Sequence, residues 1–392
     1  MALMVGCMSA SAQKIDKNEL KELQAFLSQP AEKHATNAEA LKISDLKSPS
    51  TWEGVTVENG HVTAIEWGDK HLAGALNLSD FSALTKLNVS RNAITSLNLS
   101  GDAALVRVDA QRNKITTVNL DGCSNLQVLN IYKNRITDLS ISKTPLIETV
   151  NISNNLLVEL DVANSSTLKT LNCQGNHLEM LKVEYCTNLK NLYCGYNKLT
   201  GLTFVGVEKL QNLNIDDNEI SSLIISNLPS LSTFICSDNN MNALALRQCP
   251  ALLDLVCSYN NLTSLSVENC PQLLFVDCSY NDLTSLSLNN QTFLQRLLCN
   301  NNQLTMLDVS FDPALTYINC RYNMITDLHR RRHIIRNDSL PVELLNHYLL
   351  NTRTAPCLVP TRRSLCLIRP ISITIHRITP QTAYQRLSVL PS

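Results

Sequence analysis

An asparagine recurs at one fixed spacing through more than half of this 392-residue chain. The series has twelve members without a gap: Asn92, Asn113, Asn134, Asn155, Asn176, Asn197, Asn218, Asn239, Asn260, Asn281, Asn302 and Asn323. If each repeat is numbered from its first apolar residue (Leu84 in the first repeat, Leu315 in the twelfth), the asparagine is position 9. Positions 1, 4, 11 and 14 are then apolar in all twelve repeats. A fixed period of this length is typical of a solenoid, in which each coil packs only on its neighbours.

The residues around each asparagine predict how one coil is built. Apolar side chains at positions 4 and 6 alternate with mostly polar ones at positions 3, 5 and 7, which is the period of a short strand with one buried face. The asparagine turns the chain out of that strand, and its amide can bond backbone groups that would otherwise be buried without partners. The rest of the coil, such as residues 262–267, alternates too and is too short for an ordinary helix. We therefore expect a parallel inner sheet and an extended or β-like outer wall.

The pattern Leu-x-x-Leu-x-(Cys, Ile or Val)-x-x-Asn-x-Leu covers residues 84–328 and resembles the leucine-rich-repeat family. This resemblance implies a right-handed, mainly β repeat solenoid that acts by non-covalent recognition. Seven cysteines occupy position 6, and 21-residue repeats with such a column are similar to those of the bacterial internalins, in particular the internalin J type. That likeness implies a bacterial surface or secreted protein of the adhesion type.

The ends of the repeats predict caps. Residues 13–50 include a candidate N-cap, Asp16, followed by four apolar side chains on one helical face (Leu20, Leu23, Phe26 and Leu27), so we expect a helical N-terminal cap there. Residues 51–83 predict an atypical capping coil, one residue longer than the repeats, with both tryptophans as plugs for the open core. Eleven full repeats and a partial twelfth then occupy residues 84–328.

The first twelve residues predict export in one of two ways. Ala10-Ser11-Ala12 matches a signal-peptidase site and follows an apolar start, so we expect a signal peptide over residues 1–12 and a secreted or cell-surface protein. Met4-Val5-Gly6-Cys7 also matches a lipoprotein signal, in which Cys7 would carry a lipid anchor. The basic segment that usually opens a signal peptide is missing and the apolar stretch is short, which fits a truncated start of the signal. A third interpretation is a disordered N-terminus without an export signal.

The composition changes abruptly near Leu328. Residues 1–328 carry 23 basic and 32 acidic side chains, whereas residues 329–392 carry 10 and 2, and all ten of these basic residues are arginines. A disordered native tail and a basic binding module both fit this composition. Because the arginine usage begins in mid-repeat, we favour a third interpretation, in which a frameshift makes residues 329–392 non-native.

The cysteines of the repeats predict buried thiols rather than disulfides. Seven lie at the inward position 6 (Cys173, Cys194, Cys236, Cys257, Cys278, Cys299 and Cys320) and four at position 19 (Cys123, Cys186, Cys249 and Cys270). Stacked neighbours on parallel strands point the same way, which suits disulfide geometry poorly, and the reduced side chain is among the most buried types. No C-x-x-C spacing occurs, so a zinc or redox motif lacks support.

Exposed positions 3 and 8 carry the functional signal. Their side chains are basic in the early coils (Lys86, Arg91, Arg107, Arg112 and Lys133), acidic in the middle and aromatic in the late coils. Exposed aromatic rings beside acidic groups favour recognition of a protein or carbohydrate, because tyrosine offers a large contact area and a polar tip. The candidate ligand-binding residues of this concave face are Tyr196, Asp216, Asp217, Asp238, Asp254, Tyr259, Phe275, Tyr280, Tyr317 and Tyr322. The alternative is that these side chains only decorate a solvated sheet, as we expect of the early basic residues.

Catalytic motifs are not recognisable in the chain. It contains no G-x-G-x-x-G, P-loop, H-E-x-x-H or G-x-S-x-G sequence, so we expect no enzymatic activity, no cofactor and no metal. The net charge of −1 gives no reason to expect a nucleic-acid partner, and no run of eighteen apolar residues could span a bilayer. The favoured function is binding of a protein or glycan by an exported bacterial protein. The alternatives are an effector enzyme whose catalytic domain is missing from this chain and a passive surface-structural protein.

Overall fold

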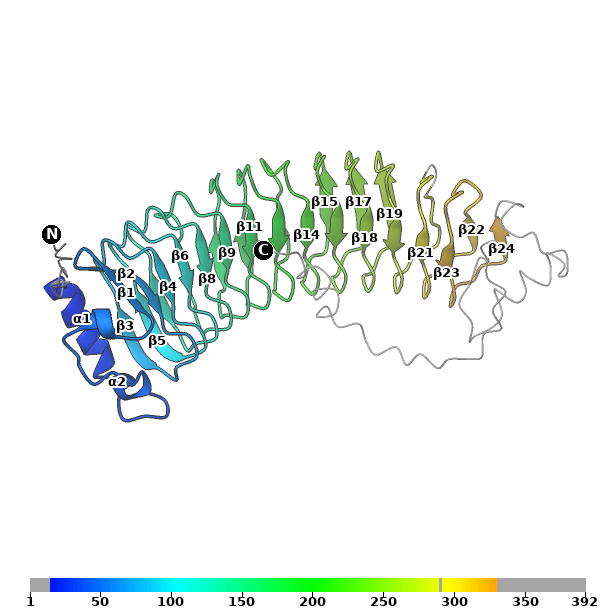
Figure 1. The fold of residues 1–392 in the computed structure, drawn as a ribbon. Coiled ribbons are helices and arrows are strands. Elements are labelled where there is room, and N and C mark those ends of the chain that lie inside the picture. The colour runs from blue at the N-terminus through cyan, green and yellow to red at the C-terminus, as the bar shows by residue number, and fades with distance from the viewer. Residues whose placement is uncertain (1–14, 289–290, 330–392) are drawn as a thin grey trace, which may run out of the picture. The chain divides into compact units, whose positions relative to one another are not determined.

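The computed structural model of the protein describes residues 15–288 and 291–329. The predicted signal segment, with its lipidation alternative at Cys7, lies outside these ranges, as does the tail beyond residue 329. Within them the predicted solenoid is confirmed, because every coil adds one strand to a long sheet with parallel neighbours (Figure 1). We number the coils 1 to 12 from Leu84 to the coil that begins at Leu315.

The inner sheet contains fourteen strands in the described part of the chain. Only its first pair, β1 and β2, is antiparallel, and the later strands pair residues at the same position of neighbouring repeats, as in Thr170 opposite Asn191. Between β2 and β4 the offset is one residue longer, as the capping coil predicts, and Ala64 lies opposite Lys86. In spatial order the strands are β1 (Val55–Glu58), β2 (His61–Glu66), β4 (Lys86–Asn88), β6 (Arg107–Asp109), β8 (Val128–Asn130), β9 (Thr149–Asn151), β11 (Thr170–Asn172), β13 (Asn191–Tyr193), β14 (Asn212–Asn214), β16 (Thr233–Ile235), β18 (Asp254–Val256), β20 (Phe275–Asp277), β21 (Arg296–Leu298) and β23 (Tyr317–Asn319).

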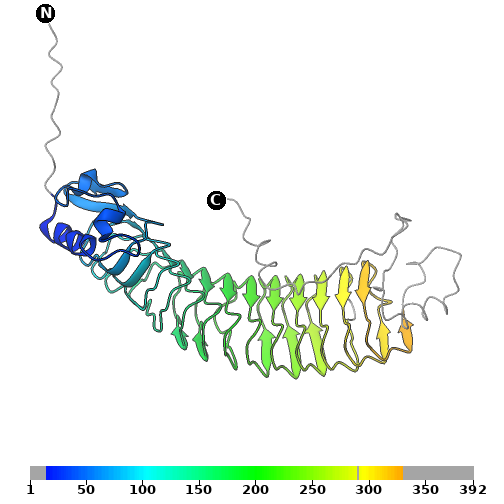
Figure 2. The same cartoon turned by 90° about the horizontal axis from the view of Figure 1, so that it is seen from below.

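The outer wall is β-like, as predicted, but among the described residues it falls into four separate sheets (Figure 2). Each sheet is parallel and joins strands from consecutive coils. The four sheets are β3 (Ala73–Asn77) with β5 (Ala93–Asn98) and β7 (Thr117–Asn119); β10 (Glu159–Asp161) with β12 (Met180–Lys182); β15 (Leu223–Ser226) with β17 (Ala243–Arg247) and β19 (Ser264–Glu268); and β22 (Met306–Asp308) with β24 (Asp327–His329).

The recurring asparagine holds neighbouring coils in register, as the repeat predicts. The Nδ2 of Asn197 donates to the backbone oxygen of Cys194 in its own coil at 3.0 Å and to that of Cys173 in the preceding coil at 3.1 Å. Its Oδ1 accepts from the backbone N–H of Leu178 at 3.0 Å. The same set of bonds recurs at the other asparagines of the ladder, for example Asn218. These bonds satisfy backbone groups that the turn after the strand would otherwise leave buried and unpaired.

The core is a continuous column of leucine, isoleucine, valine and cysteine side chains that point into the coils. The eleven cysteines of the repeats are buried and none forms a disulfide, which confirms the sequence interpretation. Burial raises the pKa of the Cys173 thiol to about 12, because removal from water disfavours the thiolate. The Cys173 thiol therefore acts as a small apolar side chain and is a poor nucleophile at neutral pH.

The N-terminal end of the column is closed by a helix and the two tryptophans. Helix α1 (Lys17–Leu27) begins at Asp16, whose side chain accepts from two backbone N–H groups of the first turn, as the sequence predicts. Its buried face includes Phe26, which stacks on Trp67 with the ring centroids 6.1 Å apart. Trp52 is buried as well. The short helices α2 (Asn37–Ala40) and η1 (Pro49–Thr51) complete this cap, and no helix in the described part of the chain is long and apolar enough to cross a membrane.

Candidate partner-binding face

Position 8 lies just after the inner strand and not within it, which corrects the expectation of an exposed strand position. Regular pairing ends at position 5, and the non-glycine residues at position 8 take a left-handed backbone with φ between 51° and 58°. Their side chains leave the turn toward solvent, and Tyr196, Asp217, Asp238 and Tyr322 are all exposed there. Position 8 thus forms a column of outward side chains along one margin of the inner sheet.

Two predicted tyrosines meet in this column. The rings of Tyr259 and Tyr280 stack with their centroids 4.3 Å apart and their planes inclined by 9°. Although the pair is stacked, 51% of Tyr259 and 43% of Tyr280 remain exposed. The stack presents a flat aromatic surface that spans two coils.

A second column, at position 3, joins two predicted aromatic residues through a residue that the sequence interpretation missed. The guanidinium carbon of Arg296 lies 5.2 Å from the ring centroid of Phe275 and 5.7 Å from that of Tyr317. Strands β20, β21 and β23 place these three residues opposite one another in register. A cation between two rings is a favourable arrangement, so the three side chains form one ordered ladder.

Asp216 is not part of the exposed surface, and its inclusion in the candidate site was wrong in this respect. It occupies position 7, where the chain has already turned away from the strand, and only 4% of the residue is exposed. Its Oδ1 has no hydrogen-bond partner among the described residues. Burial, and then the nearby charges of Asp217 and Asp238, raise the pKa of Asp216 to about 7. The buried carboxyl therefore lies beneath the exposed acidic residues.

Two further acidic side chains lie on the inner sheet beside the aromatic columns. Asp254 is half-buried at position 3, one coil before Phe275, and burial raises its pKa. Asp277, which the sequence interpretation did not select, lies at position 5 and accepts from the hydroxyl of Ser279 at 2.6 Å. Burial raises the pKa of Asp277 although this bond opposes the effect. The late coils therefore combine rings with partly desolvated carboxylates.

The early basic residues are partly engaged with other side chains. Arg107 forms an ion pair with Asp109 at 2.6 Å, and Lys86 forms one with Glu66. Arg112 donates to the hydroxyl of Tyr132 at 3.2 Å. These contacts reduce the charge that the early coils present, which supports their interpretation as solvated surface.

The structure thus brings most of the predicted residues together in two parallel columns. We call the surface from Asp238 to Tyr322 the late face. Its position-8 column contains Asp238, Tyr259, Tyr280 and Tyr322, and its position-3 column contains Asp254, Phe275, Arg296 and Tyr317. Tyr196 and Asp217 continue the first column into earlier coils. In residues 15–288 and 291–329, no group of three or more His, Cys, Asp or Glu side chains is arranged to hold a metal ion.

Solved structures of other proteins share this architecture. YopM from Yersinia enterocolitica matches with a TM-score of 0.55 and 25% identity, over 67% of this chain and 58% of that one. YopM from Yersinia pestis, described as a leucine-rich effector protein, matches with a TM-score of 0.51 and 21% identity, over 67% and 81% of the two chains. The functional domain of InlJ from Listeria monocytogenes, which includes a cysteine ladder, matches with a TM-score of 0.47 and 25% identity, over 64% of each chain.

The matched regions span less than two thirds of the InlJ chain and of the Yersinia enterocolitica YopM chain. No protein-family model matches the sequence, and no curated protein matches it either. The shared repeat, sheet and turn decide the architecture. This protein has a leucine-rich-repeat fold.

The repeat period predicts the position of Arg296, the residue that the sequence interpretation missed. Arg296 lies one repeat after Phe275 and one repeat before Tyr317, so the period alone places it in the same column. The signal in the sequence is a cation between two aromatic residues at one exposed position of consecutive repeats.

Proposed function

We propose that this leucine-rich-repeat protein is exported from a bacterium and binds a protein partner through its late face. The observation that carries the proposal is the exposed stack of Tyr259 on Tyr280. Both side chains are held by the turn after the inner strand, so their contact surface is ordered before a partner arrives. Ordered side chains lose little conformational entropy on binding.

The backbone at these tyrosines is the turn that each coil makes at position 8. Tyr259 has a φ of 53° and Tyr280 a φ of 54°, in the left-handed region that bulky residues rarely adopt. Asparagine or glycine tolerates this region better, and other coils place Asn154, Gly175 or Asn301 at position 8. Because Arg91 and Arg112 have the same left-handed φ, the turn orders the tyrosine side chains and does not by itself distinguish the late coils from the early ones.

The chemistry of the late face favours a protein partner. Tyrosine and arginine are the side chains most enriched at binding hot spots, and Arg296 lies between two rings of the same surface. Asp238 and Asp254 add acidic groups beside these anchors. We therefore expect the partner to present apolar side chains flanked by basic ones.

The test compares two pairs of alanine substitutions in the full chain. Immobilised protein is probed with panels of purified surface proteins and of glycans, and the affinity of each positive partner is measured. Tyr259→Ala with Tyr280→Ala should weaken binding at least tenfold, because hot-spot residues contribute roughly 2 kcal/mol or more each. Arg91→Ala with Arg112→Ala, at the equivalent position of the early coils, is the matched control and should leave the affinity nearly unchanged.

Opposite results would contradict the proposal in distinct ways. If the arginine pair abolishes binding and the tyrosine pair does not, the partner occupies the early coils. If glycans bind and no protein does, the partner class is wrong. Circular dichroism shows whether a variant that loses binding has also unfolded. If the alanine pair unfolds, Tyr259→Phe with Tyr280→Phe is used in its place, because it removes only the two hydroxyl groups.

Export needs its own test. The chain is expressed in a bacterium with its own N-terminus, and the mature protein is analysed by mass spectrometry. We expect the mature chain to begin at Gln13, after Ala12. A lipid on Cys7 would show the lipoprotein route, and an intact N-terminus on a protein that remains inside the cell would refute export.

A further inference from the structure

The outer wall is interrupted on both sides of coil 6. The sheet of β10 and β12 ends at Lys182, and the next sheet begins with β15 at Leu223. Between them, residues 201–206 of coil 6 form no strand. The wall therefore exposes two strand edges that face the same short segment.

Phe204 lies where coil 6 does not continue the wall. It occupies position 16, where the neighbouring coils place Val183 and Ile225 with no exposed surface. Phe204 remains only partly buried against the core there. The segment is also bounded by Gly201 and Gly206, and glycine disfavours a regular strand.

Among residues 15–288 and 291–329, no backbone group bonds to the edge of β15 that faces coil 6. The N–H of Asn227 donates to the backbone oxygen of Arg247 in the following coil at 3.2 Å. Because backbone groups alternate in direction along a strand, those of Ile224 and Ser226 face the opposite way, toward coil 6. Among the described residues, no backbone hydrogen bond joins residues 201–206 to residues 223–226.

The edge of β12 is open for most of its length as well. One coil earlier, Val162 donates to the backbone oxygen of Lys182 at 3.0 Å. The equivalent bond from Val183 to Thr203 is not formed, and contact resumes only where Tyr185 donates to the backbone oxygen of Val205 at 2.8 Å. An exposed strand edge of this kind is a template for pairing with another chain.

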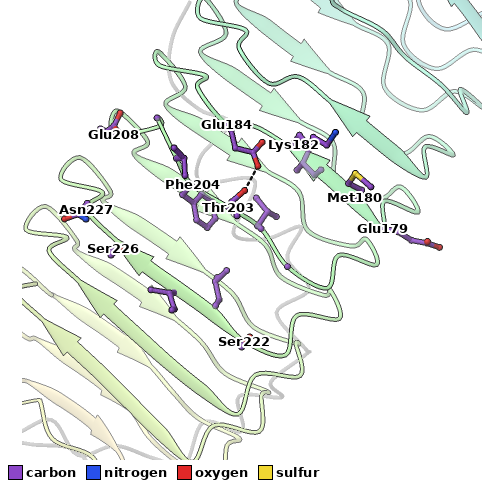
Figure 3. A pocket seen from close by; sticks show the side chains of 17 residues that line it. Glu179, Met180, Lys182, Glu184, Thr203, Phe204, Glu208, Ser222, Ser226 and Asn227 are labelled. Carbon is purple, nitrogen blue, oxygen red and sulfur yellow. Dashed lines mark hydrogen bonds between the residues drawn. The ribbon is translucent and has the colours of Figure 1, made fainter.

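A groove of about 820 Å³ lies at this interruption (Figure 3). Its floor and rims carry exposed apolar side chains, namely Met180, Val205 and Ile224, and the last of these is 74% exposed. The volume falls within the range of about 300–1,000 Å³ that is typical of ligand sites. The apolar surface requires a partner with apolar side chains.

The charges around the groove are acidic. Three glutamates line it against one lysine, and Lys182 is already paired with Asp161 of β10 at 3.1 Å. Glu184 accepts a hydrogen bond from Thr203 through one oxygen, as Figure 3 shows. Its other oxygen, Oε2, is buried and has no hydrogen-bond partner among the described residues. The acidic side chains around the groove favour a peptide that carries basic side chains.

We propose that this groove binds an extended peptide segment of a partner protein, in which apolar residues alternate with lysine or arginine. The peptide pairs as an added strand with the free edge of β15. Its apolar side chains pack on Met180, Phe204 and Ile224, and a basic side chain reaches Glu184. Strand addition of this kind takes affinity from main-chain hydrogen bonds and specificity from alternate side chains. The site is separate from the late face and does not depend on the function proposed for it.

The probe for this site is a fluorescein-labelled octapeptide in which lysine alternates with valine. Its binding to the full chain is followed by fluorescence anisotropy. We expect saturable binding that a glutamate–valine octapeptide does not show. A third peptide, with alternate backbone nitrogens methylated, should bind at least tenfold more weakly, because it cannot complete the pairing with β15. Equal binding of the methylated peptide would overturn the proposal.

Substitutions locate the peptide on the wall. Ile224→Lys should weaken binding of the lysine–valine peptide at least tenfold, and Glu184→Gln should weaken it severalfold. The matched control, Ser266→Lys, places the same charge at the same position of β19, outside the groove, and should leave the affinity unchanged. If Asp217→Asn with Asp238→Asn removes binding and Ile224→Lys does not, the peptide lies on the acidic inner face and the inference is wrong.

Amide hydrogen exchange gives an independent readout. Addition of the lysine–valine peptide should slow exchange in residues 223–226 and leave residues 243–247 of β17 unchanged, since that strand already has neighbours on both sides. Protection that is absent from β15, or spread equally over the wall, would contradict strand pairing.

Discussion

The inner sheet and the outer wall are made by the same coils, yet one is continuous and the other is broken. The described residues form one inner sheet of fourteen strands, whereas the outer wall falls into four sheets. The asparagine ladder accounts for this difference, because each asparagine bonds positions 6 and 11 of neighbouring coils. In the described part of the chain, no such bond joins residues 201–206 to residues 223–226. The inner side of each coil therefore keeps neighbouring coils in register, whereas the backbone of the outer wall differs from coil to coil and forms a groove at coil 6.

The largest expected effect comes from breaking the ladder. Asn197→Ala removes the donor to Cys173 and Cys194 and the acceptor for Leu178, all of which are buried. Each buried group left unpaired costs about 1–3 kcal/mol, so we expect a loss of about 3 kcal/mol or more. Urea denaturation followed by circular dichroism measures it, with the midpoint as the readout because long repeat arrays need not unfold in one step.

The matched substitution lies in the outer part of the same coil. Thr203→Ala removes an exposed hydrogen bond to Glu184. We expect the free energy of unfolding to change by less than about 0.5 kcal/mol, so the urea midpoint should hardly move. If the two variants unfold at the same urea concentration, the two sides of the coil contribute equally and the contrast between them is lost.

The second effect concerns the buried carboxyl of the inner side. The pKa of Asp216 is about 7 in the folded protein and near 3.8 when unfolded, so the folded protein binds more protons between these values. Stability contributed by the neutral form is thus present at low pH and is lost as the pH rises through about 7. Asp216→Asn should be more stable than the unaltered protein at pH 8, by about 2–4 kcal/mol, and nearly equal to it at pH 4.

Thermal unfolding measured from pH 4 to pH 8 checks this sign. The exposed Asp138→Asn is the control and should follow the pH profile of the unaltered protein. A variant at Asp216 that is less stable at both ends of the range would show that the carboxylate has a partner that the structure does not contain.

The contrast between the two sides also explains which features the sequence could predict. The inner sheet, the ladder and the inward cysteines each depend on one residue type at one position, repeated in many coils. The N-terminal helix and its cap at Asp16 were predicted for a similar reason, since their pattern is local. Features that recur or that involve only neighbouring residues can be read without knowledge of contacts.

The remaining features depend on a single side chain in a single coil. The burial of Asp216 depends on the turn after position 5 and on the small Gly195 beside it in the preceding coil. The period gives the register of Arg296, but its contacts with two rings depend on how three side chains lie across neighbouring coils. The groove is lined by Phe204, which is only partly buried at its position. No repeat statistic reveals such individual contacts.

A third prediction compares a polar and an apolar substitution of Cys257, an inward residue of the inner side. Cys257 has no exposed surface, and burial raises the pKa of its thiol well above the ordinary value. Cys257→Ser places a hydroxyl in this apolar column and should cost about 1–3 kcal/mol, whereas Cys257→Val should be tolerated within about 1.5 kcal/mol. Thiol labelling of the unaltered protein should be slow when folded and complete in urea without a reductant. Rapid labelling of the folded protein would contradict the buried column.

The smallest expected effect comes from two glycines of coil 6, one in the outer wall and one beside the inner sheet, which lie six residues apart in the sequence. A β-carbon added to Gly201 in the outer wall meets no atom within 4 Å, and its φ lies outside the left-handed region. Gly201→Ala should therefore stabilise the protein by about 0.4–1 kcal/mol, because it restricts the unfolded chain.

A β-carbon added to Gly195 beside the inner sheet would lie 2.9 Å from the backbone oxygen of Asp216 and closer still to its carboxylate. Gly195→Ala should thus destabilise by about 1–3 kcal/mol. Urea midpoints of the two variants, measured side by side, should move in opposite directions. If both move the same way, the outer wall has no more room for variation than the inner sheet.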